Sequence, residues 1–445
     1  MLVGVSSRPR APARTVGATL ALALAGCPAP QAPSAPAALG QTFERGRPGA
    51  VLSSVAGDGT VVLAAFAAVR PAARTVIEAL AGTVGAPPRW QVELDGLAGP
   101  LAMSGGHVVV GLAGTGTAAG VALRGEPGAV VASLDAATGA VAWKLAVDSN
   151  GWSQISSLAA LPDGAVIGGS FSGTLRIAGK VVSSAGKADG FVARLTAAGD
   201  VAWLIRLGGP GADAVQGVAA SGDRIAIAGT FSTGAELSGQ PLPSFEERTF
   251  NADGFVAELD HAGTTRWSQT FGGEADEAVA GVALDAHGRV AVAATVRATV
   301  KIGGAELVTT GPAEGLLGWW DPGGKPGMAV LVGGGGFDGL RVIAAVGDQI
   351  VVGGFYSGTL QLGARTLRAA GGDDAFVAAF DPTGNVAASW PVSGDGREEI
   401  TALAAIPGGF IAGIAHSAAV QIERDALPAP RDPLSGTAII VRAVR

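Results

Sequence analysis

Short apolar runs alternate with turns rich in glycine, aspartate and proline along most of the chain. Glycine supplies 71 of the 445 residues, and the apolar positions show almost no sustained helical period. Runs of valine, isoleucine, leucine and alanine that are bounded by turn residues are typical of β-strands. The pattern therefore predicts an all-β chain.

The pattern of strands and turns also repeats. The segment VIGGSFSGTLRIAG at 166–179 shares its double glycine, its SGTL and an aromatic residue with VVGGFYSGTLQLG at 351–363. Likewise, ADGFVARLTAAGDVAW at 188–203 matches ADGFVAELDHAGTTRW at 252–267, and DDAFVAAFDPTG at 373–384 continues the series. Repeats of this length are typical of architectures built from one supersecondary unit used many times.

Seven such units can be counted from the apolar run that opens each of them. The runs start at Val51, Leu97, Ile155, Val215, Val279, Leu340 and Ile400. Seven units of this size predict a seven-bladed β-propeller over residues 41–445. A tryptophan recurs near the end of most units, with Met328 at one place, and is expected to fill the space between blades. These tryptophans are Trp90, Trp143, Trp203, Trp267 and Trp390.

Each unit is expected to form four strands, named A to D from the axis outward. In the fourth unit they are predicted at 214–220, 224–231, 254–259 and 264–271. Small apolar residues in strand A suit the crowded centre of the ring. Between strands B and C lies a hairpin-like insertion, for example at 172–186.

The seventh unit ends one strand short, at AIIVRAVR (438–445), which aligns with strand C. Near the start of the chain, Gln41-Thr42-Phe43 repeats the Gln269-Thr270-Phe271 that ends a strand D. We therefore predict that residues 40–45 pair with the C-terminal strand and close the ring, since an unpaired strand edge would otherwise remain.

These motifs carry two family resemblances. The G-G-x-F-x-G, D-G-F-V-A and terminal tryptophan elements resemble the bacterial seven-bladed β-propeller repeat family found in secreted and lipid-anchored proteins. LDAATGAVAWKL at 134–145 resembles the blade motif of quinoprotein-like propellers. Neither resemblance fixes a function, because propellers host many.

The first residues are expected to be a signal peptide, with Arg8, Arg10 and Arg14 before an apolar stretch at 16–25. Leu24-Ala25-Gly26-Cys27 resembles the lipobox of bacterial lipoproteins, which implies cleavage before Cys27 and lipidation of its thiol. Cys27 is the only cysteine of the chain.

This resemblance divides the N-terminal region into a signal peptide at 1–26 and a lipidated cysteine with a proline- and alanine-rich tether at 27–40. Because proline follows the cysteine, the family's sorting habit implies the outer membrane. Whether the protein faces the periplasm or the cell surface stays open. A formal net charge of −7 disfavours a nucleic-acid partner.

A search for catalytic motifs is mostly negative. The sequence contains no G-x-S-x-G, H-E-x-x-H or phosphate-binding lysine motif and no pair of cysteines. The four histidines, His107, His261, His287 and His416, fall at different phases of the repeat. Neither a metal site nor a cofactor is therefore expected.

Two sets of acidic residues recur at fixed phases of the repeat and are candidates for a site. One set precedes strand A: Asp213, Asp276, Asp338 and Glu398. The other precedes strand C: Asp189, Asp253, Glu314 and Asp374. Both sets should lie on one rim, where they either form an acidic funnel for a cation or cationic partner or fix their own turns by accepting backbone N–H groups. Repetition in four blades favours the second alternative.

Three tryptophans lie outside the regular position and are candidate contacts for a partner. They are Trp152, Trp319 and Trp320.

The leading functional hypothesis is a monomeric, non-catalytic, lipid-anchored propeller that binds a protein or glycan of the cell envelope through its loops. A second is a scaffold for outer-membrane protein assembly, by analogy with lipid-anchored propellers that resemble quinoprotein blades. A third is an enzyme, either a quinoprotein dehydrogenase or a hydrolase. The quinone site of that family uses adjacent cysteines, whereas the sole cysteine here is expected to carry lipid.

Overall fold

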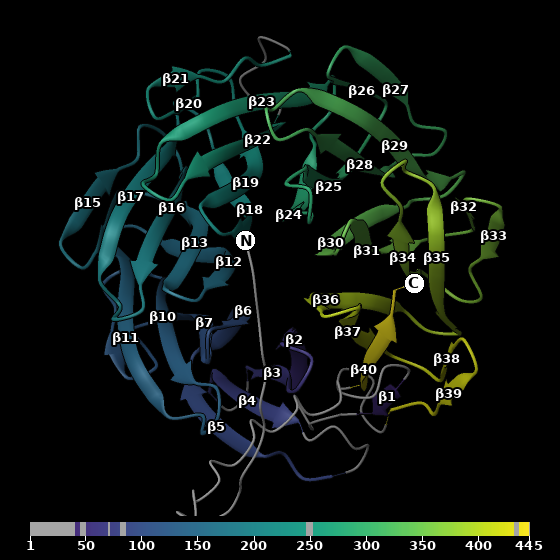
Figure 1. The fold of residues 1–445 in the computed structure, drawn as a ribbon, viewed down its shortest axis with the longest axis horizontal. Helices are drawn as coiled ribbons and strands as arrows, with labels where there is room; N and C mark the ends of the chain where they lie inside the picture. Colours follow the sequence, from purple (N-terminus) through teal and green to yellow (C-terminus); the bar gives the residue numbers. More distant parts are fainter. Residues whose placement is uncertain are drawn as a thin grey trace, which may run out of the picture. The chain divides into compact units, whose positions relative to one another are not determined.

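The computed structural model describes residues 41–44, 50–69, 72–80, 86–245, 252–430 and 436–444. Every regular element in these residues is a β-strand. Seven sheets of four or six strands are arranged as blades around a central axis (Figure 1), and β8 (Thr117–Ala118) and β9 (Val121–Ala122) form a separate two-stranded sheet. The predicted seven-bladed β-propeller is therefore confirmed. In the part of the chain that the structure describes, no helix is long and apolar enough to cross a membrane.

Each blade is an antiparallel sheet with four main strands that follow one another outward from the axis. Blade 1 contains β2 (Ala50–Gly57), β3 (Val62–Ala68), β4 (Arg74–Leu80) and β5 (Trp90–Asp95). Blade 2 contains β6 (Leu97–Ser104), β7 (His107–Gly114), β10 (Gly128–Asp135) and β11 (Val141–Ser149), with a small hairpin, β8 (Thr117–Ala118) and β9 (Val121–Ala122), between its second and third strands. Blade 3 contains β12 (Ser153–Leu161), β13 (Gly164–Phe171), β16 (Asp189–Thr196) and β17 (Val201–Gly208).

The remaining blades repeat this order. Blade 4 contains β18 (Ala214–Ser221), β19 (Arg224–Phe231), β22 (Asp253–Asp260) and β23 (Thr265–Gly273). Blade 5 contains β24 (Ala278–Leu284), β25 (Val290–Val296), β28 (Glu314–Trp320) and β29 (Pro326–Gly334). Blade 6 contains β30 (Gly339–Val346), β31 (Gln349–Tyr356), β34 (Asp374–Phe380) and β35 (Val386–Gly394). Blade 7 contains β36 (Glu398–Ile406), β37 (Gly409–His416), β40 (Gly436–Ala443) and the N-terminal β1 (Gln41–Glu44).

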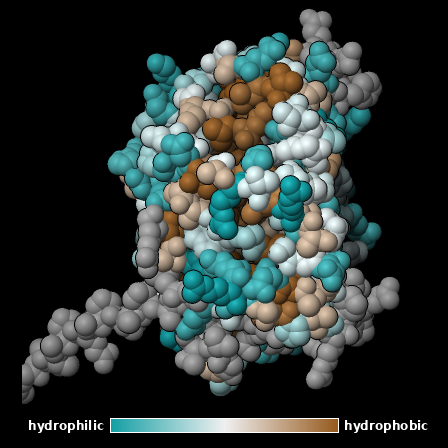
Figure 2. All heavy atoms as spheres, turned by 90° about the vertical axis from the view of Figure 1, so that its right-hand side faces the viewer, coloured by the Kyte–Doolittle hydropathy of each residue, from teal (hydrophilic) through white to brown (hydrophobic). Residues whose placement is uncertain are grey.

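The predicted insertions between strands B and C form hairpins in blades 3 to 7. They are β14 (Thr174–Ile177) with β15 (Lys180–Ser183), β20 (Glu236–Leu237) with β21 (Gln240–Pro241), β26 (Thr299–Ile302) with β27 (Ala305–Val308), β32 (Thr359–Leu362) with β33 (Arg365–Arg368), and β38 (Val420–Ile422) with β39 (Asp425–Leu427). Each hairpin pairs with strand D of the preceding blade, not with its own blade. Figure 2 shows the outer side of the ring that faces right in Figure 1, where hydrophilic groups are interspersed with apolar patches.

The core is divided among the spaces between blades. Strands B and C are buried on both faces, as the uninterrupted burial of β13 and β16 illustrates. Seven apolar clusters of described residues result, one at each junction between neighbouring blades. Exposing either face of a blade to water would therefore be unfavourable, so each blade depends on both of its neighbours for stability.

The recurring tryptophans fasten each blade to the next. The indole N–H of Trp90, Trp143 and Trp203 donates to a carbonyl in the turn between strands C and D of the following blade, at 2.9, 2.9 and 3.0 Å. Met328 occupies the same place against Gly384. Trp390 does not: it pairs with Val377, two residues beyond the regular position, and packs edge-on against Phe410 of blade 7. The inclusion of Trp390 in the regular set was therefore wrong.

The predicted closure of the ring is confirmed. β1 pairs antiparallel with β40, with Gln41 opposite Val441 and Glu44 opposite Ala438. The buried guanidinium of Arg442 donates to Gln41 O at 2.8 Å and to Thr42 Oγ1 at 3.0 Å. It also forms ion pairs of 2.9 Å with Glu423 and 3.2 Å with Asp425, beside and within β39. Arg442 thus joins the first strand, the last strand and the hairpin of blade 7.

Deletion of residues 38–46 should lower the free energy of unfolding by about 3 kcal/mol or more, because it exposes an edge of β40 and leaves the buried Arg442 with fewer partners. Deletion of 28–37, a tether segment of similar length, is the matched control and should have little effect. Urea denaturation of both variants checks this. Equal losses in the two deletions would show that β1 does not close the ring.

Candidate functional site

The acidic residues of the two predicted sets come together in pairs at four consecutive blade junctions. In each pair, one residue opens strand C of a blade and the other immediately precedes or begins strand A of the next blade. The pairs are Asp189 with Asp213, Asp253 with Glu277, Glu314 with Asp338, and Asp374 with Glu398. All lie at the rim at which strands A and C begin, which we call the strand-A rim.

One member of the predicted set has to be corrected. The backbone N–H of Glu277 donates to Ala252 O at 3.0 Å, as that of Asp213 donates to Ala188 O at 2.9 Å. Glu277 is therefore the equivalent of Asp213, and it is buried. Asp276 is exposed and accepts the N–H of Ala252 at 3.0 Å. Its assignment to the repeated position was wrong by one residue.

The paired residues are all buried, and several of them fix turns by accepting backbone N–H groups. Asp213 accepts the N–H groups of Gly209 at 2.8 Å and Ser232 at 2.7 Å. Asp338 accepts the equivalent groups of Gly334 and Ser357 at 2.7 and 3.2 Å. N–H donors aimed at both oxygens satisfy a carboxylate and do not suit a cation, so this geometry favours turn fixing over an open acidic funnel.

Strand D of blade 4 ends in two glycines, Gly272 and Gly273, and close contacts at the junction require both of them. A Cβ at Gly272 would lie 2.1 Å from Asp253 Oδ1, and a Cβ at Gly273 would lie 1.9 Å from Thr299 O of the next hairpin. The first glycine therefore makes room for the carboxylate of strand C, and the second lets the hairpin of the following blade approach. The repeated glycines and the repeated carboxylates are parts of one device.

In each of the four pairs, burial raises the pKa of at least one carboxyl group. It raises the pKa of Asp213 and of Asp338 to about 6, with the neighbouring carboxylate as a further cause. Burial and the charge of Asp374 raise the pKa of Glu398 to about 7. Burial and the charge of Asp253 raise the pKa of Glu277 to about 8. These junctions consequently favour a protonated carboxyl beside its partner.

The candidate aromatic contacts lie in different environments. Trp152 is half-buried on the strand-A rim, where its backbone N–H donates to Ser172 Oγ at 3.2 Å. Trp319 and Trp320, in β28, are 4% and 1% exposed. They belong to the apolar clusters on opposite faces of blade 5. Their selection as contact residues was wrong, because strand C is covered on both sides.

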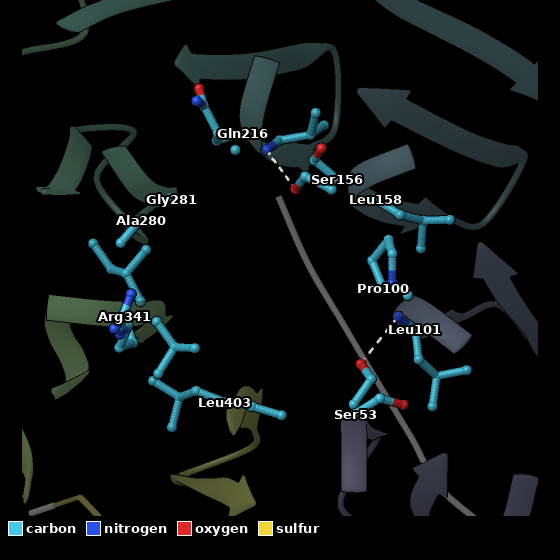
Figure 3. A pocket seen from close by; sticks show the side chains of 18 of the residues that line it. Ser53, Pro100, Leu101, Ser156, Leu158, Gln216, Ala280, Gly281, Arg341 and Leu403 are labelled. Carbon is cyan, nitrogen blue, oxygen red and sulfur yellow. Dashed lines mark hydrogen bonds between the residues drawn. The ribbon is translucent and has the colours of Figure 1, made fainter. Parts of the chain in front are cut away.

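The central channel of the ring is a second candidate site. It holds a cavity of about 460 Å³ lined by strand A of all seven blades. Each strand A has a β-bulge at the same height, where its register against strand B shifts. The extra residues form a ring around the cavity, most of which is labelled in Figure 3. This bulge ring consists of Ser53, Gly99, Ser156, Gln216, Ala280, Arg341 and Thr401.

Some polar groups of the channel have structural duties. Ser53 Oγ donates to Ala65 O of strand B at 3.1 Å. The amide of Gln216 donates to Thr230 Oγ1 and accepts the Thr230 N–H, both at 2.8 Å. These bonds replace ladder contacts that a bulge interrupts. Arg341 is the only charged residue among those that line the cavity in the described part of the chain, and its side chain is half exposed.

The histidines are dispersed, as the sequence indicates. His261 lies 3.3 Å from Asp163, and the buried His416 contacts Ala418 O through Nδ1 at 2.8 Å. Among the described residues, no group of three or more histidine, cysteine, aspartate or glutamate side chains is placed to hold a metal ion.

No family model matches the sequence, and no curated protein matches it. Among solved structures, the chain is similar to the quinohemoprotein alcohol dehydrogenase from Comamonas testosteroni, at 11% identity over 92% of this chain and 77% of that chain, with a TM-score of 0.42.

It is also similar to the β-propeller domain of the Trilobed protease from Pyrococcus furiosus, at 10% identity over 86% and 97% of the two chains, with a TM-score of 0.47. Sqt1 from Saccharomyces cerevisiae is similar at 8% identity over 91% of this chain and 98% of that chain, with a TM-score of 0.44. The chain is thus a seven-bladed β-propeller with distant structural resemblance to quinoprotein dehydrogenases and to other propellers.

The carboxylate pairs predict a loss of stability as the pH rises. Because the pKa of Glu277 is raised from 4.5 to about 8, the folded protein keeps a proton that the unfolded chain releases. This contribution is fully present below pH 4.5 and is lost as the pH rises through about 8.

Glu277→Gln should therefore gain stability relative to the unmodified protein as the pH rises from 5 to 8, by up to about 1.4 kcal/mol per pH unit. Urea denaturation across this range measures the difference. Glu306→Gln, on the exposed β27, is the control and should follow the unmodified protein. A constant difference for Glu277→Gln would mean that Glu277 titrates normally.

Proposed function

We propose that this protein is a non-catalytic binding module, anchored in the outer membrane through a lipid on Cys27, that receives a protein or glycan of the cell envelope at the strand-A rim of its channel. Cys27 and the tether lie outside the described residues, so the anchor rests on the sequence. The binding site rests on the channel and its bulge ring.

One observation carries the proposal: the bulge ring breaks the symmetry of the repeat. The residues that hold the blades together recur from blade to blade, among them the paired carboxylates, the double glycines and the tryptophans. The bulge ring instead contains small, apolar, amide, hydroxyl and guanidinium side chains in a single circle. Folding does not require different side chains at this position of each blade. Binding a ligand that lacks sevenfold symmetry does require them.

The chemistry of the lining supports binding. Hydroxyl groups, backbone groups and one guanidinium surround the cavity, together with small apolar side chains such as Pro100 and Ala280. These groups can form hydrogen bonds and one ionic contact with the tip of a partner. Among the described residues that line the cavity there is no carboxylate, histidine, cysteine, lysine or tyrosine.

Filling the channel should abolish binding. Ser156→Trp places an indole at the bulge of blade 3 and should reduce capture of envelope components by the immobilised full-length protein by about tenfold or more. Quantitative mass spectrometry of the captured material measures this.

The matched control is Val308→Trp, which adds the same side chain at a position of the outer hairpin that is 61% exposed. It should capture as the unmodified protein does. If both variants capture the same components to the same extent, the channel is not the binding site.

The anchor gives a separate prediction. Cys27→Ala should abolish incorporation of labelled palmitate in a bacterial host and move the protein from the membrane fraction to the soluble fraction. Cys27 is the only cysteine of the chain, so its thiol is the one cysteine thiol that could carry an acyl chain. Ala25→Ser, a nearby polar change that keeps the cysteine, is the control. Continued sedimentation of Cys27→Ala with membranes would contradict the lipid anchor.

A further inference from the structure

Four side chains form a continuous column at the junction of blades 5 and 6. The guanidinium carbon of Arg297 lies 5.8 Å from the ring centroid of Phe337. Phe337 stacks on Phe355 with centroids 5.8 Å apart and an interplanar angle of 30°. The guanidinium carbon of Arg341 lies 4.8 Å from the centroid of Phe355. We call these four residues the arginine–phenylalanine column; it leads from the strand-A rim to the bulge ring.

The column departs from the repeat at all four positions. Register against strand A shows that Phe355 replaces small residues of the other blades, namely Ala67, Ala113, Ser170, Thr230, Thr295 and Ala415. Arg297 stands where blades 3, 4, 6 and 7 have a serine, namely Ser172, Ser232, Ser357 and Ser417.

The other two members are equally singular. Phe337 precedes Asp338 in the loop that leads to strand A, where the neighbouring junctions have Asp276 and Arg397. Arg341 is the charged member of the bulge ring. Since other blades form with small residues in place of Phe355 and Arg297, and with different residues in place of Phe337 and Arg341, the fold does not require the column.

The backbone around the column is shaped to admit it. A Cβ at Gly339 would lie 2.9 Å from ring atoms of Phe355, and 2.5 Å from Thr295 Oγ1. A glycine at the start of β30 therefore makes room for the ring. Phe337 remains 41% exposed at the outer end.

The two arginines are held mainly by aromatic rings. Arg341 has Glu399 at 4.0 Å, with both side chains 41% or more exposed, which is a weak pair. Arg206, by contrast, lies 2.5 Å from the buried Asp189, and Arg442 contacts two carboxylates. A guanidinium that rests on a ring keeps its N–H donors at its edge, where they can bind a carboxylate in bidentate fashion.

We infer that the column is the recognition element of the channel mouth and that it binds an acidic segment of a protein partner through glutamate or aspartate side chains. This inference rests on the proposed function and specifies the partner that the rim accepts. Each ring has its companion ring beside it and an arginine over its plane, so the column presents cations and not a free aromatic face for a sugar or a base.

An extended peptide matches this arrangement. Side chains on one side of a strand recur about every 7 Å, so acidic residues spaced along an extended segment can reach both arginines, which are separated by two stacked rings. The chain as a whole is acidic, with a formal net charge of −7. The column therefore marks the place where an acidic partner can approach.

The test uses the full-length protein and a fluorescent hexaglutamate peptide, with binding measured by fluorescence anisotropy at low ionic strength. The unmodified protein should bind the peptide, and Arg297→Gln/Arg341→Gln should weaken binding by about tenfold or more. Arg176→Gln/Arg368→Gln removes the same charge from exposed positions on β14 and β33 and should bind as the unmodified protein does.

Phe355→Ser introduces the residue that blade 3 has at this position, Ser170, so the variant should fold. It should nevertheless bind the peptide more weakly, because the ring that supports Arg341 is removed. Thermal unfolding of all variants checks that they are folded. Absence of binding to the unmodified protein, or equal weakening by both arginine pairs, would overturn the inference. Equally tight, column-dependent binding of inorganic phosphate or trigalacturonic acid would overturn the assignment to a peptide.

The two proposals fail separately. If hexaglutamate does not bind but Ser156→Trp still abolishes capture of envelope components, only the acidic partner is wrong. If Ser156→Trp also has no effect, the channel is not a binding site at all.

Discussion

The structure depends on one constraint, which is that each blade is apolar on both faces. A sheet of this kind cannot be stable alone, because water would cover two apolar surfaces at once. The seven interblade clusters satisfy the constraint only if the ring is closed. Closure explains why a short N-terminal strand pairs with β40 and why Arg442, although charged, is buried among groups from three elements. The tryptophans and crossing hairpins serve the same purpose at the outer edge.

The carboxylate pairs show how the junctions are sealed at the strand-A rim. Each junction brings two strand ends and a hairpin together, which leaves backbone N–H groups that need acceptors. A carboxylate meets this need with little volume, and the glycines before it allow the close approach. At two other junctions a hydroxyl satisfies a backbone carbonyl instead: Thr75 Oγ1 donates to Gly96 O at 2.8 Å and Ser153 Oγ to Val147 O at 2.6 Å. The recurring acidic residues are therefore part of the scaffold.

Much of this architecture could be predicted from the sequence, because the strands, the blade number and the closing strand follow from patterns that repeat. Strand B of the fourth unit was predicted at its observed limits, 224–231. The failures have local causes. Acidic residues at 274, 276 and 277 made the register ambiguous, and only the backbone bond of Glu277 identifies the equivalent position. Trp319 and Trp320 were selected as candidate contacts because they lie outside the regular tryptophan position, but consecutive residues of strand C face different junctions and are buried in both. The bulges could not be predicted from the sequence. One extra residue interrupts the alternation of apolar and polar positions in strand A, and that alternation is already irregular because the chain is rich in glycine and alanine.

Scaffold and candidate site therefore occupy different positions of the same repeat. Positions that seal a junction are constrained by two blades and vary little, whereas a bulged residue is displaced from the ladder and faces the channel. Such a residue can change without disturbing either neighbour, and this freedom allows the ring to hold Ser156, Gln216 and Arg341 at equivalent places. The arginine–phenylalanine column extends the same principle outward, since Phe355 uses room left by Gly339 and Arg341 uses a bulge. A propeller can in this way acquire an asymmetric recognition surface while the forces that close the ring stay unchanged.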